Sequence, residues 1–558
     1  MKRSLAAFRS ILCLATSLVA CRHGESGETP SGTPRPSVHE EIAVSAPARR
    51  QATRTDLSGG WWRDDVFYEV FVRSFADVDG DGVGDFRGLT SKLDDLVELG
   101  VNGLWLMPIH PSPSYHGYDV TNYRAVNPDY GTEADFDGFL AEAHRRGLRV
   151  IIDFVLNHSS SEHPWFLESG SSPESERRSW YVWRPAPDAR LRRPWDGSLD
   201  IWHPGPSGYY YGLFWSGMPD LNLAHPAVEQ EMVESMRFWL ERGVDGFRVD
   251  AVRYLVEDED GTNADTESTH AVLKRIRSAL VETHPQALLV AEAWTERSKV
   301  APYYGEGGDE MQLAFGFDSA SAIMQAAKDG LRVSAVQSAQ DLVKTFDDVN
   351  FVAPFLTNHD MPRAMRAFDD VGAPEAARPA AATLFAWPGT PFIYYGEEIG
   401  MRGGPSRADE DKRTPMRWSR EPGFGFTGGK PWRSSDEPDG VDVASQRKDP
   451  ASLWHLYRRL VRLRRGEPAL SEGQLAVPPV AGASRGFAAF LRSTAEQRIL
   501  FIVNYHDQPS APITVEVTDL KAAEVLLTEG LQGEVEVTAE GVKAPALAGR
   551  GFAFLRLD

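Results

Sequence analysis

Cysteine is almost absent from this sequence. The 558 residues include two cysteines, Cys13 and Cys21, both in the N-terminal segment. The rest of the chain therefore offers neither a disulfide framework nor a thiolate for catalysis or metal binding. Its chemistry must come from carboxylates, histidines, hydroxyls or bound ions.

Long basic runs and membrane-length apolar runs are also missing. The formal net charge is −21 at pH 7, which argues against binding to nucleic-acid phosphates. The apolar stretch in MKRSLAAFRSILCLATSLVAC follows a basic start and ends in small residues. It is too short for a membrane span and predicts an export signal at residues 1–20.

Cys21 suggests a lipid anchor. LVAC at residues 18–21 resembles a bacterial lipoprotein signal, which implies cleavage before Cys21 and lipid attachment to its thiol. An ordinary secretion signal with an incidental cysteine is the alternative. Residues 21–60 are rich in Pro, Ser, Gly and Glu and predict a disordered linker. We therefore expect an exported protein, lipid-anchored to a bacterial membrane and facing the periplasm or the cell exterior.

From Trp61 onward, apolar strands alternate with amphipathic helices. Runs such as VFYEVFVRSF and LRVIIDFVLNH are typical of strands. Amphipathic runs typical of helices, such as TEADFDGFLAEAHRRG, lie between the strand-like runs. This alternation indicates a parallel sheet covered by helices. About eight strands over roughly 400 residues predict a (β/α)8 barrel. A doubly wound open sheet is the alternative, but no glycine-rich phosphate loop follows the first strand.

Two further segments differ from the barrel in composition and in their pattern of apolar residues. Residues 159–217 are rich in Pro, Gly, Trp and Tyr and predict a subdomain inserted after the third strand. Residues 473–558 contain short β-rich runs between turns and predict a C-terminal all-β sandwich. The barrel would then occupy residues 61–158 and 218–472. Its last helix, SLWHLYRRLVRLRR, carries a leucine stripe that should cap it.

Charged residues collect where the predicted strands end. Arg248 and Asp250 share one face of GVDGFRVDAV, since residues two apart in a strand point the same way. Alone, they could form a structural ion pair. Other strand ends carry Asp153, Asn157, His158, Glu292, His359 and Asp360. Barrel active sites form at these ends, and burying so many charges is costly, so the set predicts a catalytic site.

The motifs at these strand ends resemble those of the α-amylase family of glycoside hydrolases. DFVLNH, GFRVDAV, VAEAW and TNHD match its four main motifs in order. MPDLN matches a further motif, in a form between oligoglucosidase-like and neopullulanase-like members. The resemblance runs from about Trp61 to the end of the chain. It implies a TIM barrel with an inserted subdomain and a C-terminal sandwich.

The resemblance also implies roles for single residues. Asp250 would be the nucleophile, Glu292 the general acid and base, and Asp360 the carboxylate that binds sugar hydroxyls. Retaining hydrolysis needs one ionised and one protonated carboxyl about 5 to 5.5 Å apart. Arg248 would keep Asp250 ionised, and burial with nearby carboxylates would raise the pKa of Glu292. The implied substrate-binding residues are His116, Tyr118, Asp119, His158, Arg248, His359 and Arg413. Taken singly, each histidine could be structural.

A calcium site is predicted in DVDGDGVGD at residues 77–85. The expected ligands are hard oxygens, from Asp77, Asp79, Asp81, the Val83 carbonyl and Asp85. The loop begins like an EF-hand but has Gly88 at the twelfth position. It resembles the Ca²⁺ site after the first barrel strand of oligoglucosidase-like members. An acidic turn without metal is the alternative, and a second ion near Asn157 is not predicted.

The bond specificity rests on three positions. Ala251 after the nucleophile is typical of members that act on α-1,4 bonds. In exo-acting relatives, an Asp at the position of Tyr115 pairs with the Arg at Arg413 and closes the pocket, and a Tyr should leave it open. We therefore predict a monomeric α-amylase-type hydrolase that cleaves internal bonds of an α-glucan. The alternatives are an exo-acting α-glucosidase or transglucosylase and a non-enzymatic glucan-binding lipoprotein. The presence of all three carboxylates disfavours the last.

Overall fold

The computed structural model describes residues 60–258, 260–406, 408–482 and 484–558. The expected signal peptide, the lipid-attachment residue Cys21 and the linker up to residue 59 lie outside these residues. No helix within them is both long and apolar enough to cross a membrane.

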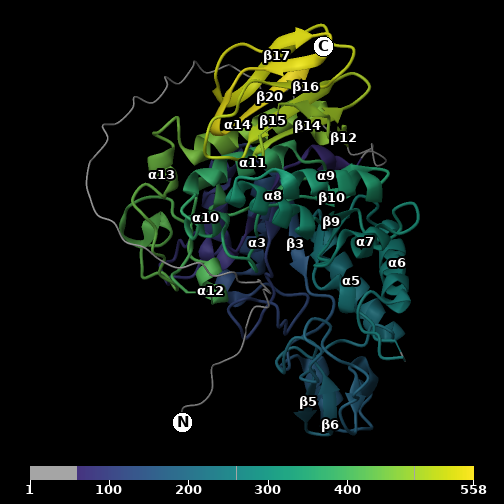
Figure 1. Ribbon diagram of the computed structural model, residues 1–558. Coiled ribbons are helices and arrows are strands. Elements are labelled where there is room, and N and C mark those ends of the chain that lie inside the picture. The colour runs from purple at the N-terminus through teal and green to yellow at the C-terminus, as the bar shows by residue number, and fades with distance from the viewer. Residues whose placement is uncertain (1–59, 259, 407, 483) are drawn as a thin grey trace, which may run out of the picture. The chain divides into compact units, whose positions relative to one another are not determined.

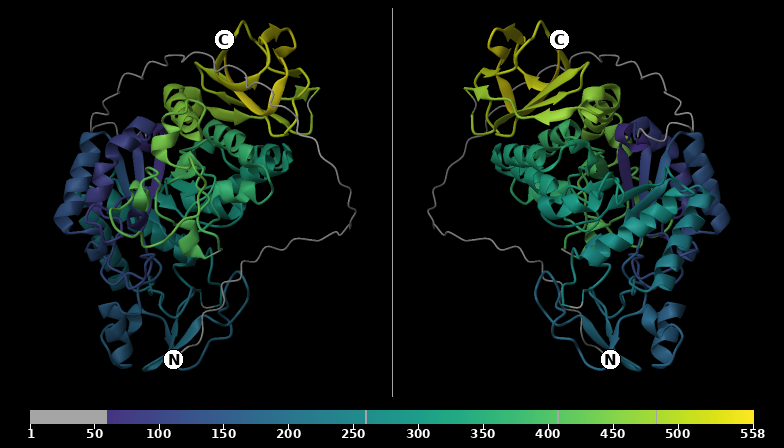
Figure 2. Two further views of the ribbon diagram at one scale, coloured as in Figure 1. Left: turned by 90° about the vertical axis from the view of Figure 1, so that its left-hand side faces the viewer. Right: turned by 90° about the vertical axis from the view of Figure 1, so that its right-hand side faces the viewer.

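Within the described residues, eight parallel strands form one sheet, in the order β10-β9-β8-β7-β3-β2-β1-β11. They are β1 (Phe67–Val70), β2 (Gly103–Leu106), β3 (Arg149–Phe154), β7 (Gly246–Val249), β8 (Leu288–Ala291), β9 (Leu313–Phe315), β10 (Val352–Ala353) and β11 (Phe392–Tyr394). The edges β10 and β11 meet through two backbone hydrogen bonds, from Thr390 to the Val352 carbonyl at 2.9 Å and from Phe392 to the Pro354 carbonyl at 2.8 Å. The sheet thus curls into the predicted barrel, with helices outside it (Figures 1 and 2).

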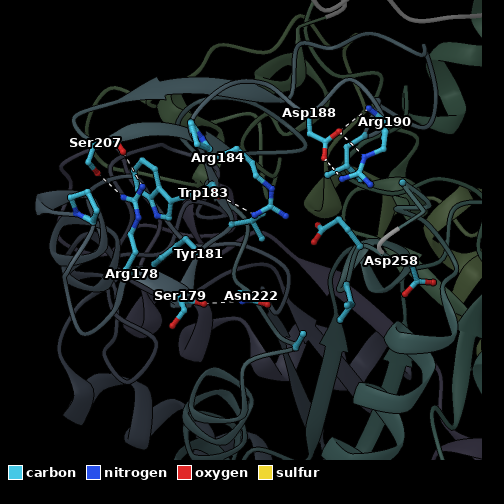
Figure 3. A pocket seen from close by; sticks show the side chains of 18 residues that line it. Arg178, Ser179, Tyr181, Trp183, Arg184, Asp188, Arg190, Ser207, Asn222 and Asp258 are labelled. Carbon is cyan, nitrogen blue, oxygen red and sulfur yellow. Dashed lines mark hydrogen bonds and ion pairs between the residues drawn. The ribbon is translucent and has the colours of Figure 1, made fainter.

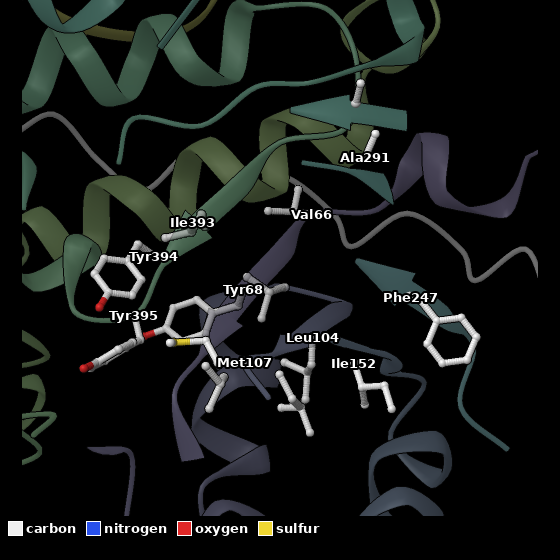
Figure 4. Packing of buried hydrophobic residues seen from close by; sticks show 14 of the residues in the cluster. Val66, Tyr68, Leu104, Met107, Ile152, Phe247, Ala291, Ile393, Tyr394 and Tyr395 are labelled. Atoms are coloured by element: carbon white, nitrogen blue, oxygen red, sulfur yellow. The ribbon is translucent and has the colours of Figure 1, made fainter. Parts of the chain in front are cut away.

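Side chains alternate along each strand between the barrel interior and the layer beneath the helices. The interior cluster includes Phe67, Trp105, Ile151, Leu288, Val290, Phe315 and Phe392. The cluster beneath the helices includes the sequence neighbours Tyr68, Leu104, Ile152, Phe247 and Ile393 (Figure 4). This alternation assigns Glu69 and Asp153 to the interior row, because each follows an interior residue by two positions.

The longer barrel helices follow from capping and apolar periodicity. α3 (Glu133–Arg145) begins with a capping box between Thr132 and Asp135, and it buries Phe136, Phe139 and Leu140 at helical spacing. The other helices outside the insertion are α1 (Phe86–Ser91), α2 (Leu93–Leu99), α5 (Pro226–Arg242), α6 (Glu267–Val281), α7 (Arg297–Val300), α8 (Phe317–Asp329), α9 (Val333–Thr345), α10 (Ala364–Asp369), α11 (Ala377–Ala386), α12 (Asp409–Lys412), α13 (Val443–Gln446), α14 (Leu453–Gly466) and α15 (Pro468–Ser471).

The insertion after β3 has its own small core. It contains α4 (Pro164–Ser171) and a three-stranded antiparallel sheet in its described residues, made of β4 (Trp183–Arg184), β5 (Trp202–Gly205) and β6 (Gly208–Tyr211). One cluster of its buried apolar side chains consists of Leu191, Ile201, Trp202, Tyr211 and Leu213. This segment thus forms a small sheet and a helix between β3 and α5, and its assignment as a subdomain stays a prediction.

The C-terminal strands form two antiparallel sheets. In the described residues, one sheet has the order β12-β14-β15-β20-β17 and the other has β13-β16-β19-β18. The strands are β12 (Gln474–Ala476), β13 (Val480–Ala481), β14 (Phe487–Ser493), β15 (Arg498–Asn504), β16 (Ile513–Val515), β17 (Ala523–Leu531), β18 (Glu536–Thr538), β19 (Gly541–Ala544) and β20 (Leu547–Leu557). Leu500 and Ile502 of β15 pack between the sheets, whereas Phe501 and Val503 join the barrel-side core. β15 is buried on both faces, which explains its continuous apolar sequence.

Candidate active site

One buried guanidinium joins the two carboxylates expected to act on the bond. Arg248 is 1% exposed, and its Nη1 donates to Oδ1 of Asp250 at 2.6 Å. Its Nη2 lies 3.7 Å from Oε2 of Glu292. β7 and β8 are adjacent in the sheet, so this contact follows from the strand order. The structure therefore brings Asp250 and Glu292 to the same end of the barrel, and their catalytic roles stay predictions.

Asp153 orients this guanidinium from β3. Arg248 Nη1 also donates to both oxygens of Asp153, at 2.8 and 3.0 Å. Asp153 is fully buried, and burial raises its pKa to about 6, with Arg248 opposing the rise and Asp250 adding to it. The arginine thus lies between two carboxylates, which fixes the side from which it reaches Asp250.

Glu292 has the electrostatics of a general acid. Burial raises its pKa to about 7, while Arg248 opposes the rise and the charges of Asp250 and Asp360 add to it. The backbone N–H of Ala251 donates to its Oε2 at 2.9 Å. A carboxyl that holds its proton near neutral pH can donate it to a leaving group.

Asp360 is held as an anion by two cations. Its Oδ1 accepts from Arg413 Nη2 at 2.9 Å, and its Oδ2 lies 3.0 Å from His359 Nε2. Burial by itself would raise the pKa of Asp360, but His359 and Arg413 outweigh it and hold that pKa well below its usual range. An ionised carboxylate in this position can accept hydrogen bonds from sugar hydroxyls.

Sequence reasoning missed Glu69. This buried residue of β1 lies with its Oε1 2.6 Å from Nδ1 of His359. The available signal was a single charge within the apolar run VFYEVFV, at the same strand parity as the interior Phe67. Barrel register was needed to see which strand end it would face.

Tyr118 and His158 line the same region. The Tyr118 hydroxyl donates to Oδ2 of Asp153 at 2.9 Å, and its ring stacks 5.6 Å from that of His359. His158 is buried against Phe214, and its Nε2 has no hydrogen-bond partner among the described residues. Burial lowers the pKa of His158, so the ring is neutral at neutral pH. An unpartnered buried nitrogen of this kind is suited to a ligand hydroxyl.

Asp119 and His116 shape the loop that carries Tyr118. The Asp119 carboxylate accepts hydrogen bonds from the hydroxyls of Ser112 and Ser114. His116 Nδ1 accepts from the backbone N–H of Tyr118 at 3.1 Å. These contacts hold the loop on which Tyr118 lies, and the substrate-binding roles of Asp119 and His116 stay predictions.

Tyr115 and Arg413 are in contact. Arg413 Nη1 donates to the Tyr115 hydroxyl at 3.2 Å, and the guanidinium carbon lies 5.7 Å from the centre of the ring. The sequence suggested that a tyrosine would leave this side open. Its longer side chain reaches the arginine, but it offers only an uncharged hydroxyl, whereas the charge of Arg413 is paired with the Asp360 carboxylate.

The acidic loop gathers three of the predicted calcium ligands. Side-chain oxygens of Asp77, Asp79 and Asp85 all lie within 4.8 Å of one another. Asp81 lies outside this group and accepts from the backbone N–H of Val83 at 2.7 Å. Asp85 also caps α1 through Gly88. A set of close carboxylates fits the oxygen preference of Ca²⁺.

A hollow of about 850 Å³ lies beside the inserted strands. Its lining residues include none of the residues predicted for the active site. Several of its polar side chains are already paired, among them Arg190 with Asp188 and Arg178 with Ser207 (Figure 3). The hollow is therefore separate from the carboxylate centre.

A family model described as "Alpha amylase, catalytic domain" matches residues 69–473. The chain belongs to the α-amylase family. It is 37% identical to "Alpha-amylase 3" of Dictyoglomus thermophilum over 450 residues, which cover 80% of this chain and 85% of that protein. It is 34% identical to a "Probable alpha-glucosidase" of Rhizobium meliloti over 550 residues, which cover 87% of this chain and 96% of that one. The crystal structure of the α-amylase from H. orenii superposes with a TM-score of 0.77 at 35% identity and covers 88% of this chain and 99% of that one.

This membership makes the protein an α-amylase-family glycoside hydrolase. It also gives the carboxylate cluster a chemical context, since glycoside hydrolysis depends on paired carboxyl groups. The individual residue roles and the position of the bond that is cut stay predictions.

Proposed function

We propose that this α-amylase-family protein is a retaining hydrolase of internal α-1,4 bonds in α-glucans. The observation that carries the proposal is the contact between Tyr115 and Arg413, in which the guanidinium donates to an uncharged hydroxyl at 3.2 Å and forms no ion pair with it. A hydrogen bond from a cation to an uncharged hydroxyl is weaker than a bidentate ion pair with a carboxylate, and it is easier for a longer chain to displace. The similarity to proteins named α-amylase supports the same assignment.

The proposed chemistry uses the geometry in two steps. A carboxylate oxygen of Asp250 attacks the anomeric carbon, and the bond from that carbon to the glycosidic oxygen breaks as Glu292 transfers its proton to that oxygen. A water molecule then attacks the same carbon, gives a proton to Glu292, and displaces the Asp250 oxygen. Arg248 contacts both carboxyl groups, so one cation balances the charge that moves between them.

The second candidate is an exo-acting α-glucosidase or transglucosylase. It is favoured by the fact that Tyr115 does reach Arg413, because even a contact with an uncharged hydroxyl narrows that side of the cleft. The similarity to a probable α-glucosidase supports it as well. The two candidates differ in where a chain is cut, and not in the catalytic carboxylates.

The deciding experiment compares products from starch and from maltose. An internal hydrolase should lower the viscosity of starch before much reducing sugar appears, and it should act poorly on maltose, which supplies little remote binding energy. Early release of glucose and rapid cleavage of maltose would replace the first candidate with the second. Tyr115→Asp should shift the products toward glucose, and Tyr115→Phe is the matched control that lacks only the hydroxyl.

Calcium binding is part of the proposal. Asp77, Asp79 and Asp85 would hold the ion, which would stabilise the loop after β1 and take no part in the bond cleavage. The loop packs closely on the 427–432 segment, since a Cβ on Gly82 would lie 2.1 Å from the Lys430 carbonyl oxygen. Ordering the loop should therefore also order that segment.

We further propose that the protein is exported and anchored by lipid at Cys21. The motif LVAC at residues 18–21 supports this assignment. Cys21→Ser should release the protein from the membrane fraction if the thiol carries the lipid. Retention of that variant in the membrane fraction would contradict the anchor.

A further inference from the structure

His359 lies between carboxylates on both of its ring nitrogens. Nδ1 is 2.6 Å from Oε1 of Glu69, and Nε2 is 3.0 Å from Oδ2 of Asp360. His359 is 0% exposed and Glu69 is 2% exposed. Water therefore cannot screen either contact.

The direction of the hydrogen bonds fixes the protons on this ring. The Tyr118 hydroxyl lies 2.6 Å from His359 Nε2 and donates its one proton to Asp153. Because an ionised carboxylate only accepts, the hydroxyl accepts from the histidine, so Nε2 carries a proton. This one N–H faces two acceptors, the Tyr118 hydroxyl at 2.6 Å and Oδ2 of Asp360 at 3.0 Å, and is shared between them. Glu69 likewise only accepts, so Nδ1 must carry the second proton.

The surrounding charges agree with a doubly protonated ring. Burial would lower the pKa of His359, but Asp360 and Glu69 outweigh that effect and raise it to about 9. Asp153 from β3 adds a further negative charge nearby. Arg248 and Arg413 face this cluster, and each is bonded to a carboxylate of it. A third cation, Lys412, donates from Nζ to the backbone carbonyl of Asp360 at 2.8 Å. The uncharged ring of Trp105 lies 5.7 Å from that of His359 between ring centres.

We propose that Glu69 is a positioning residue that keeps His359 doubly protonated, so that Nε2–H stays bound to Asp360. If Nδ1 lost its carboxylate partner, the neutral ring could keep its proton on Nδ1 and turn a lone pair toward Asp360. Asp360 would then lose the hydrogen bond that His359 donates to its Oδ2, and the carboxylate would be held less firmly for binding sugar hydroxyls. The catalytic meaning of this inference rests on the proposed role of Asp360, whereas the protonation of the ring does not.

The kinetic test uses α-maltosyl fluoride, whose leaving group needs little help from an acid. The pH limb caused by Glu292 should then be suppressed, and kcat/KM should fall only as His359 loses its proton, near pH 9. Glu69→Gln keeps the shape but removes the charge, and it should lower this limb by roughly 1 to 3 pH units. Glu69→Asp keeps the negative charge, so kcat/KM of this variant should fall at a pH close to that of the wild type. An unmoved limb in folded Glu69→Gln would overturn the proposal.

A second measurement does not depend on turnover or on the folding of any Glu69 variant. An NMR spectrum of wild-type protein labelled with ¹⁵N-histidine should show, at pH 8, one imidazole ring with both nitrogens protonated. That signal should vanish in His359→Gln. A spectrum in which every histidine ring is neutral at pH 8 would overturn the proposal, even if the enzyme proved to be exo-acting. A failure of the proposed substrate assignment would leave this spectrum unchanged, so the two failures can be told apart.

Discussion

The backbone N–H of Ala251 donates a hydrogen bond to Glu292 Oε2 at 2.9 Å from a residue whose φ is 51°. The residue after the proposed nucleophile is thus held in the left-handed region, and its amide points at the proposed acid. Alanine tolerates this backbone poorly and a β-branched residue tolerates it worse.

We expect Ala251→Val to destabilise the fold by about 1 to 2 kcal/mol, because a β-branched side chain at positive φ is strained. It should also lower kcat/KM roughly 10-fold or more, because the amide moves away from Glu292. Thermal melts and kinetics with maltooligosaccharides measure both effects. Ala251→Gly is the control, since it relieves the strain and keeps the N–H. A valine variant that matches the wild type in both measurements would contradict this account.

Asp250→Asn should reduce glucan hydrolysis by roughly 10⁴-fold or more while the fold persists, because an amide cannot form the glycosyl-enzyme. Circular dichroism and a melting curve check the fold, and reducing-sugar release measures the activity. Asp341→Asn, on the exposed part of α9, is the matched control and should act like the wild type. Substantial turnover by verified Asp250→Asn would remove Asp250 from its proposed role.

The pH dependence should follow from Glu292. Its raised pKa of about 7 means that the carboxyl is protonated below that pH and loses its proton above it. A general acid must carry its proton, so kcat/KM on maltooligosaccharides should fall as the pH rises through about 7. With α-maltosyl fluoride this limb should disappear, because fluoride needs little protonation. A limb that stays at the same pH with both substrates would argue against Glu292 as its source.

Glu397 should make the fold less stable at alkaline pH. It is buried, its Oε1 accepts from the Tyr457 hydroxyl at 2.8 Å, and burial raises its pKa to about 8. Its stabilising contribution is complete below its unfolded pKa and is lost as the pH rises through about 8, because ionisation then becomes costly in the folded state. Glu397→Gln should therefore raise the melting temperature relative to the wild type by roughly 2 to 5 °C at pH 8, and by less at pH 5. An equal difference at both pH values would exclude this titration.

Calcium should stabilise the protein through Asp79. Among the three grouped carboxylates, Asp79 is the exposed one and accepts a single backbone N–H, from Asp81 at 3.2 Å, through an oxygen that asparagine keeps. Asp77 and Asp85 are buried, and each accepts two backbone N–H groups that hold the loop. Asp79→Asn should therefore remove the rise in melting temperature on adding Ca²⁺ without lowering the value in chelator. Asp81→Asn, outside the group, is the control and should keep the calcium response. A wild-type melt that ignores both calcium and chelator would mean that the loop binds no ion.

The barrel, the order of its motifs and the carboxylates at the strand ends could all be predicted from the amino-acid sequence. Apolar strands with helices between them can bury both faces only in a parallel sheet covered on its outside, so local patterns were sufficient. The leucine stripe of α14 and the turn-separated strands of the C-terminal sandwich are readable for the same reason. One strand, β9 (Leu313–Phe315), is too short to stand out from its surroundings.

Contacts between residues far apart in the chain could not be predicted in this way, because they depend on the folded arrangement. Glu69 and His359 are 290 positions apart in the sequence, and the barrel register places them 2.6 Å from each other. Tyr115 and Arg413 meet because two loops converge, which neither loop encodes alone. The left-handed conformation of Ala251 also depends on what surrounds it. Pattern in a sequence reflects burial and local backbone preference, whereas a hydrogen bond between distant residues depends on how the strands close into a barrel and how the loops pack above it.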